Sequence, residues 1–186
     1  MTTAYFAFLG FLVVERLFEL FLSRANARAA LARGGREVGH AHFRVMAAVH
    51  TLFLAACALE VLLLERPFVP ALGYGALALA LGAQGLRYWA IATLGQRWNV
   101  RILFVPGEAP VTRGPYRWVR HPNYAAVIIE LAAVPLIHSA WLTALVFTAA
   151  NAWLLSVRIA AEEKALGEAY QAAFAGRARF IPRGQP

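Results

Sequence analysis

Long apolar runs separated by arginine-rich connections organise the 186 residues of this chain. A helix that crosses a bilayer needs about 20 mostly apolar residues. Five segments approach or exceed that length, at residues 3–22, 43–64, 69–94, 123–138 and 140–159. The fourth is short, and Ser139 marks a tight turn after it, so the last two segments are predicted to form an antiparallel hairpin. The fifth is expected to continue as a helix past Glu163. The pattern predicts an all-α integral membrane protein with about five transmembrane helices.

The chain is long enough for one domain, and we expect a single membrane domain over residues 1–186. Residues 1–94 hold three spans, whereas residues 95–186 hold a strap, the short helical hairpin and a C-terminal tail. In the strap, Trp98, Val100, Ile102 and Phe104 alternate with polar residues, and prolines and glycines then interrupt the chain. Alternation with a period of two predicts an extended segment, which we place over the cytoplasmic surface.

The distribution of arginine predicts the orientation. Arginines concentrate in residues 23–42, in residues 95–122 and in the tail, whereas the opposite connections hold Arg66 alone. Basic residues stay on the cytoplasmic side, so we expect a multi-pass protein of the inner membrane with its N-terminus outside and its C-terminus in the cytoplasm. With 60% hydrophobic residues, the net charge of +8 suits anionic membrane lipids. No basic module with interleaved aromatic residues lies outside the apolar runs, so we expect no nucleic-acid partner.

Residue types disfavour several other kinds of site. The chain has one cysteine, Cys57, and no aspartate. This leaves few ligands for a metal, so we expect none, and it rules out a Ser-His-Asp triad. Gly73 and Gly75 match a relaxed dinucleotide fingerprint, but they lie inside an apolar span without a preceding strand. We therefore interpret them as positions of close helix approach.

Charged residues inside the predicted spans need partners in a bilayer. Glu15, Arg16 and Glu19 lie close together on one helix and are predicted to form an ion cluster in the bundle interior or at the membrane interface. Glu130 lies about two turns into the fourth span. It either pairs with Arg87 inside the bundle, which we favour, or faces a tunnel for an acceptor molecule.

Two polar clusters flank the predicted hairpin, at residues 114–124 and 158–163. The first combines prolines, aromatic rings and His121, and the second carries Arg158 and Glu162 four residues apart on one helix face. An antiparallel hairpin brings both clusters to one membrane level, which predicts a pocket with aromatic faces, backbone acceptors, a carboxylate and a guanidinium. The alternative is that the arginines anchor the protein to headgroups, while Trp118 and Tyr124 form an interfacial belt.

At these residues the sequence resembles the isoprenylcysteine carboxyl methyltransferase (ICMT) family of membrane enzymes. The matching motifs are Gly114-Pro115-Tyr116, Arg120-His121-Pro122-Asn123-Tyr124 and Arg158-x-x-x-Glu162-Glu163. The resemblance covers roughly residues 98–182 and implies methyl transfer from S-adenosylmethionine to an oxygen of a lipophilic acceptor at the cytoplasmic membrane face. It places Arg158 at the acceptor, with a catalytic role. It places the cofactor against residues 108–111 of the strap and against the corner and helix end, at Pro110, Val111, Tyr116, His121, Pro122, Asn123, Tyr124 and Glu162.

Residues 97–102 and 128–132 look like those of bacterial family members linked to type III polyketide synthases, which methylate alkylpyrone or alkylresorcinol hydroxyls. This likeness implies a lipid-tailed enol, phenol or carboxylate as acceptor and a polyketide synthase as a possible partner. Arg158 would favour the anion of a phenol, whose pKa is near 10. His121 either acts as a base or holds the turn through a hydrogen bond.

Two other functions stay open. Membrane sterol and isoprenoid reductases share the general architecture of the C-terminal region and use NADPH, although they are usually much longer and the present sequence has no added basic cluster for a phosphate. A non-catalytic membrane assembly factor could also retain the fold. The presence of Tyr116, His121, Tyr124, Arg158 and Glu162 together argues against the latter.

Overall fold

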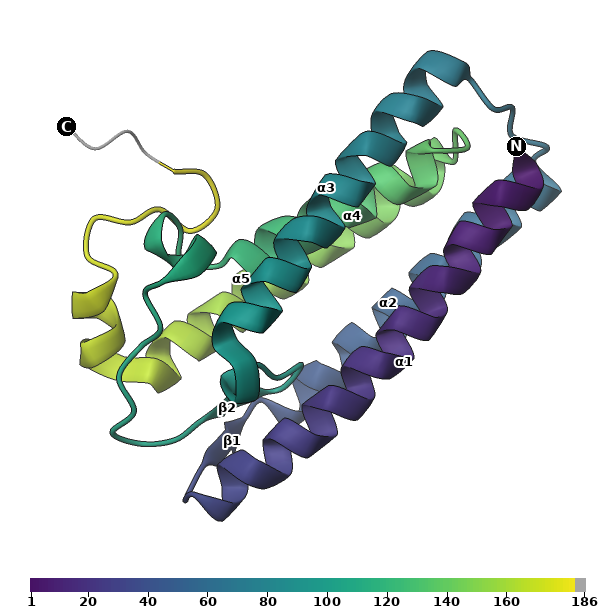
Figure 1. The fold of residues 1–186 in the computed structure, drawn as a ribbon. Coiled ribbons are helices and arrows are strands. Elements are labelled where there is room, and N and C mark those ends of the chain that lie inside the picture. The colour runs from purple at the N-terminus through teal and green to yellow at the C-terminus, as the bar shows by residue number, and fades with distance from the viewer. Residues whose placement is uncertain (183–186) are drawn as a thin grey trace.

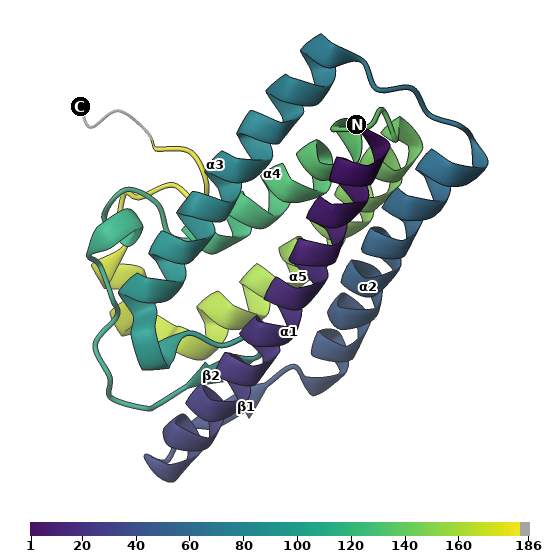
Figure 2. The ribbon, with the colours of Figure 1, turned by 45° about the vertical axis from the view of Figure 1, so that its right-hand side comes forward.

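The computed structural model describes residues 1–182 of the chain, without the side chains of residues 40 and 41. Its main elements (Figure 1, Figure 2) are the helices α1 Thr2–Ala32, α2 His40–Leu63, α3 Pro70–Leu94, α4 Pro122–Leu136 and α5 Trp141–Ala173. The shorter elements are the strands β1 Arg36–Val38 and β2 Ile102–Phe104 and the 3₁₀ turns η1 Gly95–Arg97 and η2 Gly114–Arg117. The described part is thus mostly helical, as the sequence predicts.

The two ends of the helical bundle differ in content (Figure 1). The N-terminus and the connections 64–69 and 137–140 lie at one end, whereas the strands, the strap, η2 and the segment after α5 gather at the other. The arginine-rich connections therefore share one end, as the predicted orientation requires. The number of membrane crossings, and the side that faces the cytoplasm, stay predictions.

The predicted hairpin of α4 and α5 is present. Ser139 in the turn has a φ of 57°, and the Ala140 N–H donates to the Pro135 carbonyl at 2.9 Å. α5 continues past Glu163, as expected, but Gly167 interrupts it with φ 71° and ψ −162°. Because almost only glycine adopts this conformation, the last turns of α5 change direction at this residue.

The first helix is longer than the apolar pattern indicates, since α1 continues to Ala32 and the pattern ends at residue 22. Its buried stripe begins apolar, becomes charged, continues with neutral polar side chains and ends with two alanines, at Tyr5, Leu9, Leu12, Glu15, Glu19, Ser23, Asn26, Ala27 and Ala30. Alanine and arginine, which favour helix, dominate residues 24–32. The neutral polar part of the stripe, at Ser23 and Asn26, is buried, and α1 packs against η1. The last turns of α1 are therefore packed against the protein and do not form a solvated connection.

Charged residues in the bundle pair with one another. Arg16 donates to Glu19 at 2.9 Å and to Glu15 at 3.0 Å. Arg87 of α3 forms a bidentate ion pair with Glu130 of α4, with Nε to Oε1 at 2.9 Å, and the two side chains are 4% and 8% exposed. The predicted ion cluster and the pairing of Glu130 with Arg87 are both confirmed.

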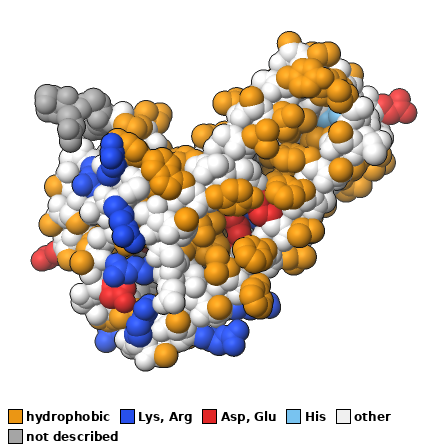
Figure 3. Space-filling view, in the orientation of Figure 1, with side chains coloured by type: hydrophobic (Ala, Val, Ile, Leu, Met, Phe, Trp, Pro, Cys, Tyr) orange, Lys and Arg blue, Asp and Glu red, His pale blue; other side chains and the backbone are white. Residues whose placement is uncertain are grey.

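Away from the arginine-rich end, the bundle surface is apolar (Figure 3). Exposed side chains there include Phe11 and Phe18 on α1 and Leu145 and Trp153 on α5. In the described part of the chain, residues His42–Leu63 of α2 and helix α5 are long and apolar enough to cross a membrane, and α4 is shorter. A membrane protein is supported, whereas five spans remain a prediction.

The strap is extended where the alternating pattern predicts it, and it pairs with a strand that the pattern does not reveal. β2 runs antiparallel to β1, with Ile102 opposite Val38 and Phe104 opposite Arg36. A three-residue strand is too short to show a period. This pairing ties the strap to the connection between α1 and α2.

Candidate functional site

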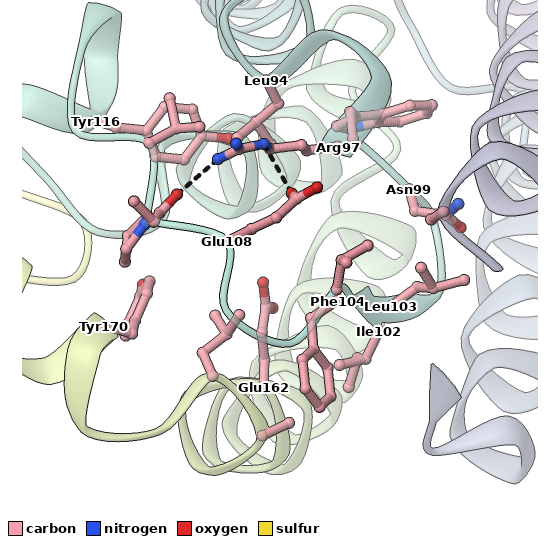
Figure 4. Close-up of a pocket in the computed structure, with 18 of the residues that line it drawn as sticks. Leu94, Arg97, Asn99, Ile102, Leu103, Phe104, Glu108, Tyr116, Glu162 and Tyr170 are labelled. Carbon is pink, nitrogen blue, oxygen red and sulfur yellow. Dashed lines mark hydrogen bonds and ion pairs between the residues drawn. The ribbon is translucent and has the colours of Figure 1, made fainter. Parts of the chain in front are cut away.

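A cavity of about 510 Å³ lies at the arginine-rich end (Figure 4). Its wall is formed by the ends of α1, α3 and α5, by the strap, and by the corner that leads from η2 into α4. Pockets of about 300–1,000 Å³ are typical for small molecules and cofactors. The cavity is therefore the candidate binding site.

The structure brings the predicted site residues together around this cavity. Eight of the nine line it, namely Pro110, Val111, Tyr116, His121, Asn123, Tyr124, Arg158 and Glu162. Pro122 does not line it but is buried at the first position of α4, where proline fits a helix start. Its effect is therefore on the shape of the corner. The corner and the end of α5 meet, as the hairpin predicts.

A chain of hydrogen bonds links Arg158, Tyr124 and Glu162. Arg158 donates from Nε to the Tyr124 hydroxyl at 2.7 Å and from Nη2 to the Val100 carbonyl at 2.8 Å. The Tyr124 hydroxyl donates to Glu162. Arg158 is 4% exposed, and no carboxylate in residues 1–182 forms an ion pair with it. Glu162 reaches it only through the Tyr124 hydroxyl. A buried cation without a direct counter-ion is costly, so this position suits an anionic ligand.

His121 is held by contacts on both sides. Its Nε2 lies 3.1 Å from Oε1 of Glu163, and its ring stacks on Tyr124 with 5.2 Å between the ring centroids. Arg179 donates to the same carboxylate at 2.8 Å, and this hydrogen bond raises the pKa of the guanidinium. The structure thus shows the hydrogen-bonding role of His121, and its role as a base stays a prediction.

Aromatic side chains from the last turns of α5 close another part of the wall. Tyr170 and Phe174 pack with Tyr116 of η2 and Ala90 of α3 in one apolar cluster. Burial, followed by the negative charge of Glu162, raises the pKa of Tyr116. A phenol is already neutral at physiological pH, and the raised pKa keeps it neutral at higher pH as well. Tyr170 and Phe174 are not among the predicted site residues, although their spacing of four residues indicates a shared helix face.

Arg97, which is not among the predicted site residues, connects two parts of the strap at the cavity (Figure 4). Arg97 pairs with Glu108 at 3.0 Å and donates to the Ala109 carbonyl at 2.6 Å. Glu108, which the resemblance places near the cofactor, lines the cavity but is engaged by Arg97 and by Arg33 at 3.8 Å. The opposite charges on either side of the Pro106-Gly107 turn were the available signal for the pair with Arg97.

Two buried polar atoms in the wall have no partner within the part of the chain that is described, the Trp98 Nε1 and the Asn123 Oδ1. Because buried polar groups are nearly always hydrogen-bonded, an unpaired donor and acceptor suit a polar ligand. The Glu162 carboxylate suits an ammonium group or ribose hydroxyls. The residues present therefore fit a nucleoside that carries an amino-acid group, as S-adenosylmethionine does.

Comparison with known proteins identifies the family of the chain. A model of the isoprenylcysteine carboxyl methyltransferase family matches residues 76–168. The uncharacterized protein YpbQ of Bacillus subtilis (strain 168) is 42% identical over 161 residues, which cover 86% of this chain and 95% of that protein. An uncharacterized protein of Haemophilus influenzae is 30% identical over 157 residues, which cover 83% of this chain and 90% of that protein. The chain therefore belongs to the isoprenylcysteine carboxyl methyltransferase family, whose members are membrane methyltransferases.

Proposed function

We propose that this protein transfers the methyl group of S-adenosylmethionine to an oxygen of a lipophilic, anionic acceptor at the cytoplasmic face of the inner membrane. The acceptor class is a lipid-tailed enol, phenol or carboxylate. One observation carries the proposal: Arg158, a buried guanidinium without a carboxylate partner in the described chain, lies beside Tyr124 and Glu162 in the cavity wall.

The cofactor would be held by Glu162, Asn123 and the rings of Tyr116 and Tyr124. Glu162 offers a carboxylate to an ammonium or to ribose hydroxyls, and Asn123 offers an unpartnered carbonyl oxygen. Aromatic faces attract a cation such as a sulfonium. When bound, S-adenosylmethionine supplies a methyl group that its positively charged sulfur has already activated.

Arg158 would hold the acceptor oxygen and favour its anionic form. A guanidinium that donates to an oxyanion stabilises it and lowers the pKa of a phenol from its ordinary value, near 10. A carboxylate arrives ionised and needs no base, and a phenol whose pKa is lowered would release its proton to water before the methyl transfer. The remaining task of the residues in the wall is to align the acceptor oxygen with the methyl group and to exclude water, and such positioning contributes several kcal/mol to catalysis.

The lipophilic character of the acceptor follows from the setting of the cavity. Its wall includes Leu94, Ile102 and Phe104, and the adjoining bundle surface is apolar (Figure 3). A lipid-tailed acceptor would enter from the bilayer, and a soluble cofactor would enter from the cytoplasm at the arginine-rich end. Alkylresorcinols and alkylpyrones belong to this acceptor class, and a type III polyketide synthase is the partner that would supply them.

A cofactor titration in detergent tests the first part of the proposal. S-adenosylmethionine is expected to bind, and Glu162→Ala should weaken binding by about tenfold, the value of one charge-assisted hydrogen bond. The matched control is Glu168→Ala, which removes an exposed carboxylate from the same helix and should leave the affinity unchanged. Binding of NADPH instead would identify a reductase, and binding of neither would favour an assembly factor. Either result contradicts the proposal.

A methyl-transfer assay tests the second part. Membranes that contain the protein are incubated with radiolabelled S-adenosylmethionine, and the labelled lipid is identified. Pentadecylresorcinol and S-farnesylcysteine serve as phenol and carboxylate probes. Arg158→Ala should lower turnover by about tenfold or more while cofactor affinity changes by less than about threefold. Normal methylation by a folded Arg158→Ala protein would remove Arg158 from the site.

A further inference from the structure

A set of hydrogen bonds fastens the strap to α1, outside the residues that the motifs of the corner and of α5 contain. Ser23 and Asn26 are buried, with 2% and 6% of their surfaces exposed. Ser23 Oγ donates to Asn99 Oδ1 at 2.8 Å, and Asn99 Nδ2 donates back to the Ser23 carbonyl at 3.0 Å. Asn26 Nδ2 donates to the Trp98 carbonyl at 2.8 Å. We call Ser23, Asn26 and Asn99 the α1–strap junction.

Val100 connects this junction to Arg158. The Val100 N–H donates to Ser23 Oγ at 3.2 Å, and the Val100 carbonyl accepts from Arg158 Nη2 at 2.8 Å. Ser23 thus holds Val100 through its N–H, and Val100 in turn holds Arg158 through its carbonyl. A shift of Val100 therefore moves the acceptor of one of the two hydrogen bonds that fix the guanidinium.

The strap depends on the junction for its position at this point. η1 ends at Arg97 and β2 begins at Ile102, so residues 98–101 belong to neither element. Asn99 Oδ1 also accepts from the Arg101 N–H at 3.0 Å, which shapes the turn locally. In many proteins a buried polar pair has a structural role alone and holds a segment in place. Here, however, the backbone of Val100, which the junction holds, also accepts a hydrogen bond from Arg158 in the cavity wall. The junction therefore also affects the position of Arg158.

We propose that Ser23 and Asn99 are positioning residues that orient Arg158 through the backbone of Val100. This inference rests on the proposed function, because Arg158 is oriented toward the acceptor oxygen. Tyr124 holds the guanidinium at Nε and Val100 holds it at Nη2. Among the described residues no hydrogen bond involves Nη1. With two of its three nitrogens held, Nη1 is the nitrogen left to bind the acceptor in the cavity that Arg158 lines.

The test compares four variants of the protein in detergent: Ser23→Ala, Ser23→Thr, Asn99→Ala and Ser156→Ala. Ser23→Ala removes the hydroxyl, and Ser23→Thr keeps it. Ser156→Ala is the matched control, because it removes an exposed hydroxyl of α5 that donates to the Trp153 carbonyl, away from the strap. Methyl transfer to pentadecylresorcinol and S-farnesylcysteine gives kcat and KM, a titration gives the cofactor Kd, and thermal unfolding gives Tm.

Ser23→Ala is expected to lower kcat by about fivefold, the value of roughly one hydrogen bond, with the cofactor Kd unchanged. The Tm should fall by a few degrees, because the Val100 N–H loses its acceptor, so kcat is measured well below the Tm of every variant. Ser23→Thr should restore most of the turnover, and Ser156→Ala should match the wild type. Asn99→Ala should reproduce the effect of Ser23→Ala from the opposite side of the junction. Unchanged kcat in both alanine variants, or a loss of kcat that merely follows a loss of Tm, would overturn the proposal.

A double-mutant cycle with Arg158→Ala separates positioning from simple fastening. If the junction acts through Arg158, Ser23→Ala lowers kcat in the wild-type background and has no further effect once Arg158 is absent. An equal loss in both backgrounds contradicts the proposal. Failure of the wild type to methylate either probe would overturn the proposed acceptor chemistry and the inference with it. An active wild type with an equally active Ser23→Ala variant would overturn the inference alone.

Discussion

Arg158 donates a hydrogen bond from Nε to the hydroxyl oxygen of Tyr124 across 2.7 Å. The same hydroxyl donates to Glu162, so a phenol lies between a guanidinium and a carboxylate that are four residues apart on α5. Arginine and glutamate at this spacing otherwise pair directly. The Tyr124 hydroxyl therefore separates the residue that we assign to the acceptor from the residue that we assign to the cofactor.

Removal of this hydroxyl should reduce turnover more than cofactor binding. In Tyr124→Phe the aromatic face remains, but Arg158 and Glu162 are free to form a direct ion pair, which competes with the acceptor anion. We expect kcat to fall by about tenfold and the cofactor Kd to change by less than about threefold. The same methyl-transfer assay and cofactor titration measure both quantities. A kcat equal to that of the wild type would show that turnover does not depend on the Tyr124 hydroxyl keeping Arg158 and Glu162 apart.

The meeting of the corner with the end of α5 could be predicted from the sequence because it follows from local features. Two apolar runs separated by a short turn at Ser139 define a hairpin, and a hairpin places residues 121–124 beside residues 158–163. The contacts of His121 with Glu163 and of Tyr124 with Glu162 fulfil that expectation. Composition and helical spacing were sufficient at this point.

The α1–strap junction could not be predicted in the same way. Ser23 and Asn26 follow an apolar run and look like the solvated end of a helix, yet they are buried because the strap folds back onto them. This contact joins residues that are distant in sequence, and no periodic pattern near Ser23 indicates its partner. Likewise, the three residues of β1 give no strand pattern before β2 is seen beside them.

The buried pair of Arg87 and Glu130 supports a prediction about stability. Arg87→Met leaves the Glu130 and Glu19 carboxylates without this guanidinium and should lower the free energy of unfolding in detergent by about 3–5 kcal/mol. The double variant Arg87→Met with Glu130→Leu should recover at least half of that loss, because no unpaired charge then remains at position 130. Unfolding by titration with denaturing detergent measures these differences.

A partly exposed pair provides the control for this prediction. The side chains of Arg97 and Glu108 are 41% and 27% exposed, so Glu108→Gln should change the free energy of unfolding by less than about 1 kcal/mol. If Arg87→Met were no more destabilising than Glu108→Gln, the ion cluster would contribute nothing to the packing of α3 against α4.

Glu60 of α2 caps the first turn of α5 from outside that helix. Its carboxylate accepts from the Thr143 N–H at 2.6 Å, from the Thr143 hydroxyl at 2.7 Å and from the Leu142 N–H at 3.2 Å. The residue before α5, Ala140, has no capping side chain. We expect Glu60→Ala to lower the free energy of unfolding by about 2 kcal/mol. Thr143→Val removes only the hydroxyl and should cost less than half as much, whereas equal losses would mean that the backbone N–H groups do not need Glu60.

Gly167 should control the direction of the last turns of α5 and, through them, the cavity wall. Its φ of 71° and ψ of −162° fall in a region that alanine adopts only at a cost of about 1–3 kcal/mol. Space is not the limit, since a Cβ added at this position would have no neighbouring atom within 4 Å. In Gly167→Ala the helix is therefore expected to continue straight and to carry Tyr170 and Phe174 away from Tyr116, which weakens cofactor binding by about tenfold.

Gly85→Ala, in the regular part of α3 and equally free of close neighbours, should leave binding unchanged and stabilise the protein by up to about 1 kcal/mol. Cofactor titration and thermal unfolding of the two variants in detergent distinguish a required kink at Gly167 from a glycine that is merely tolerated.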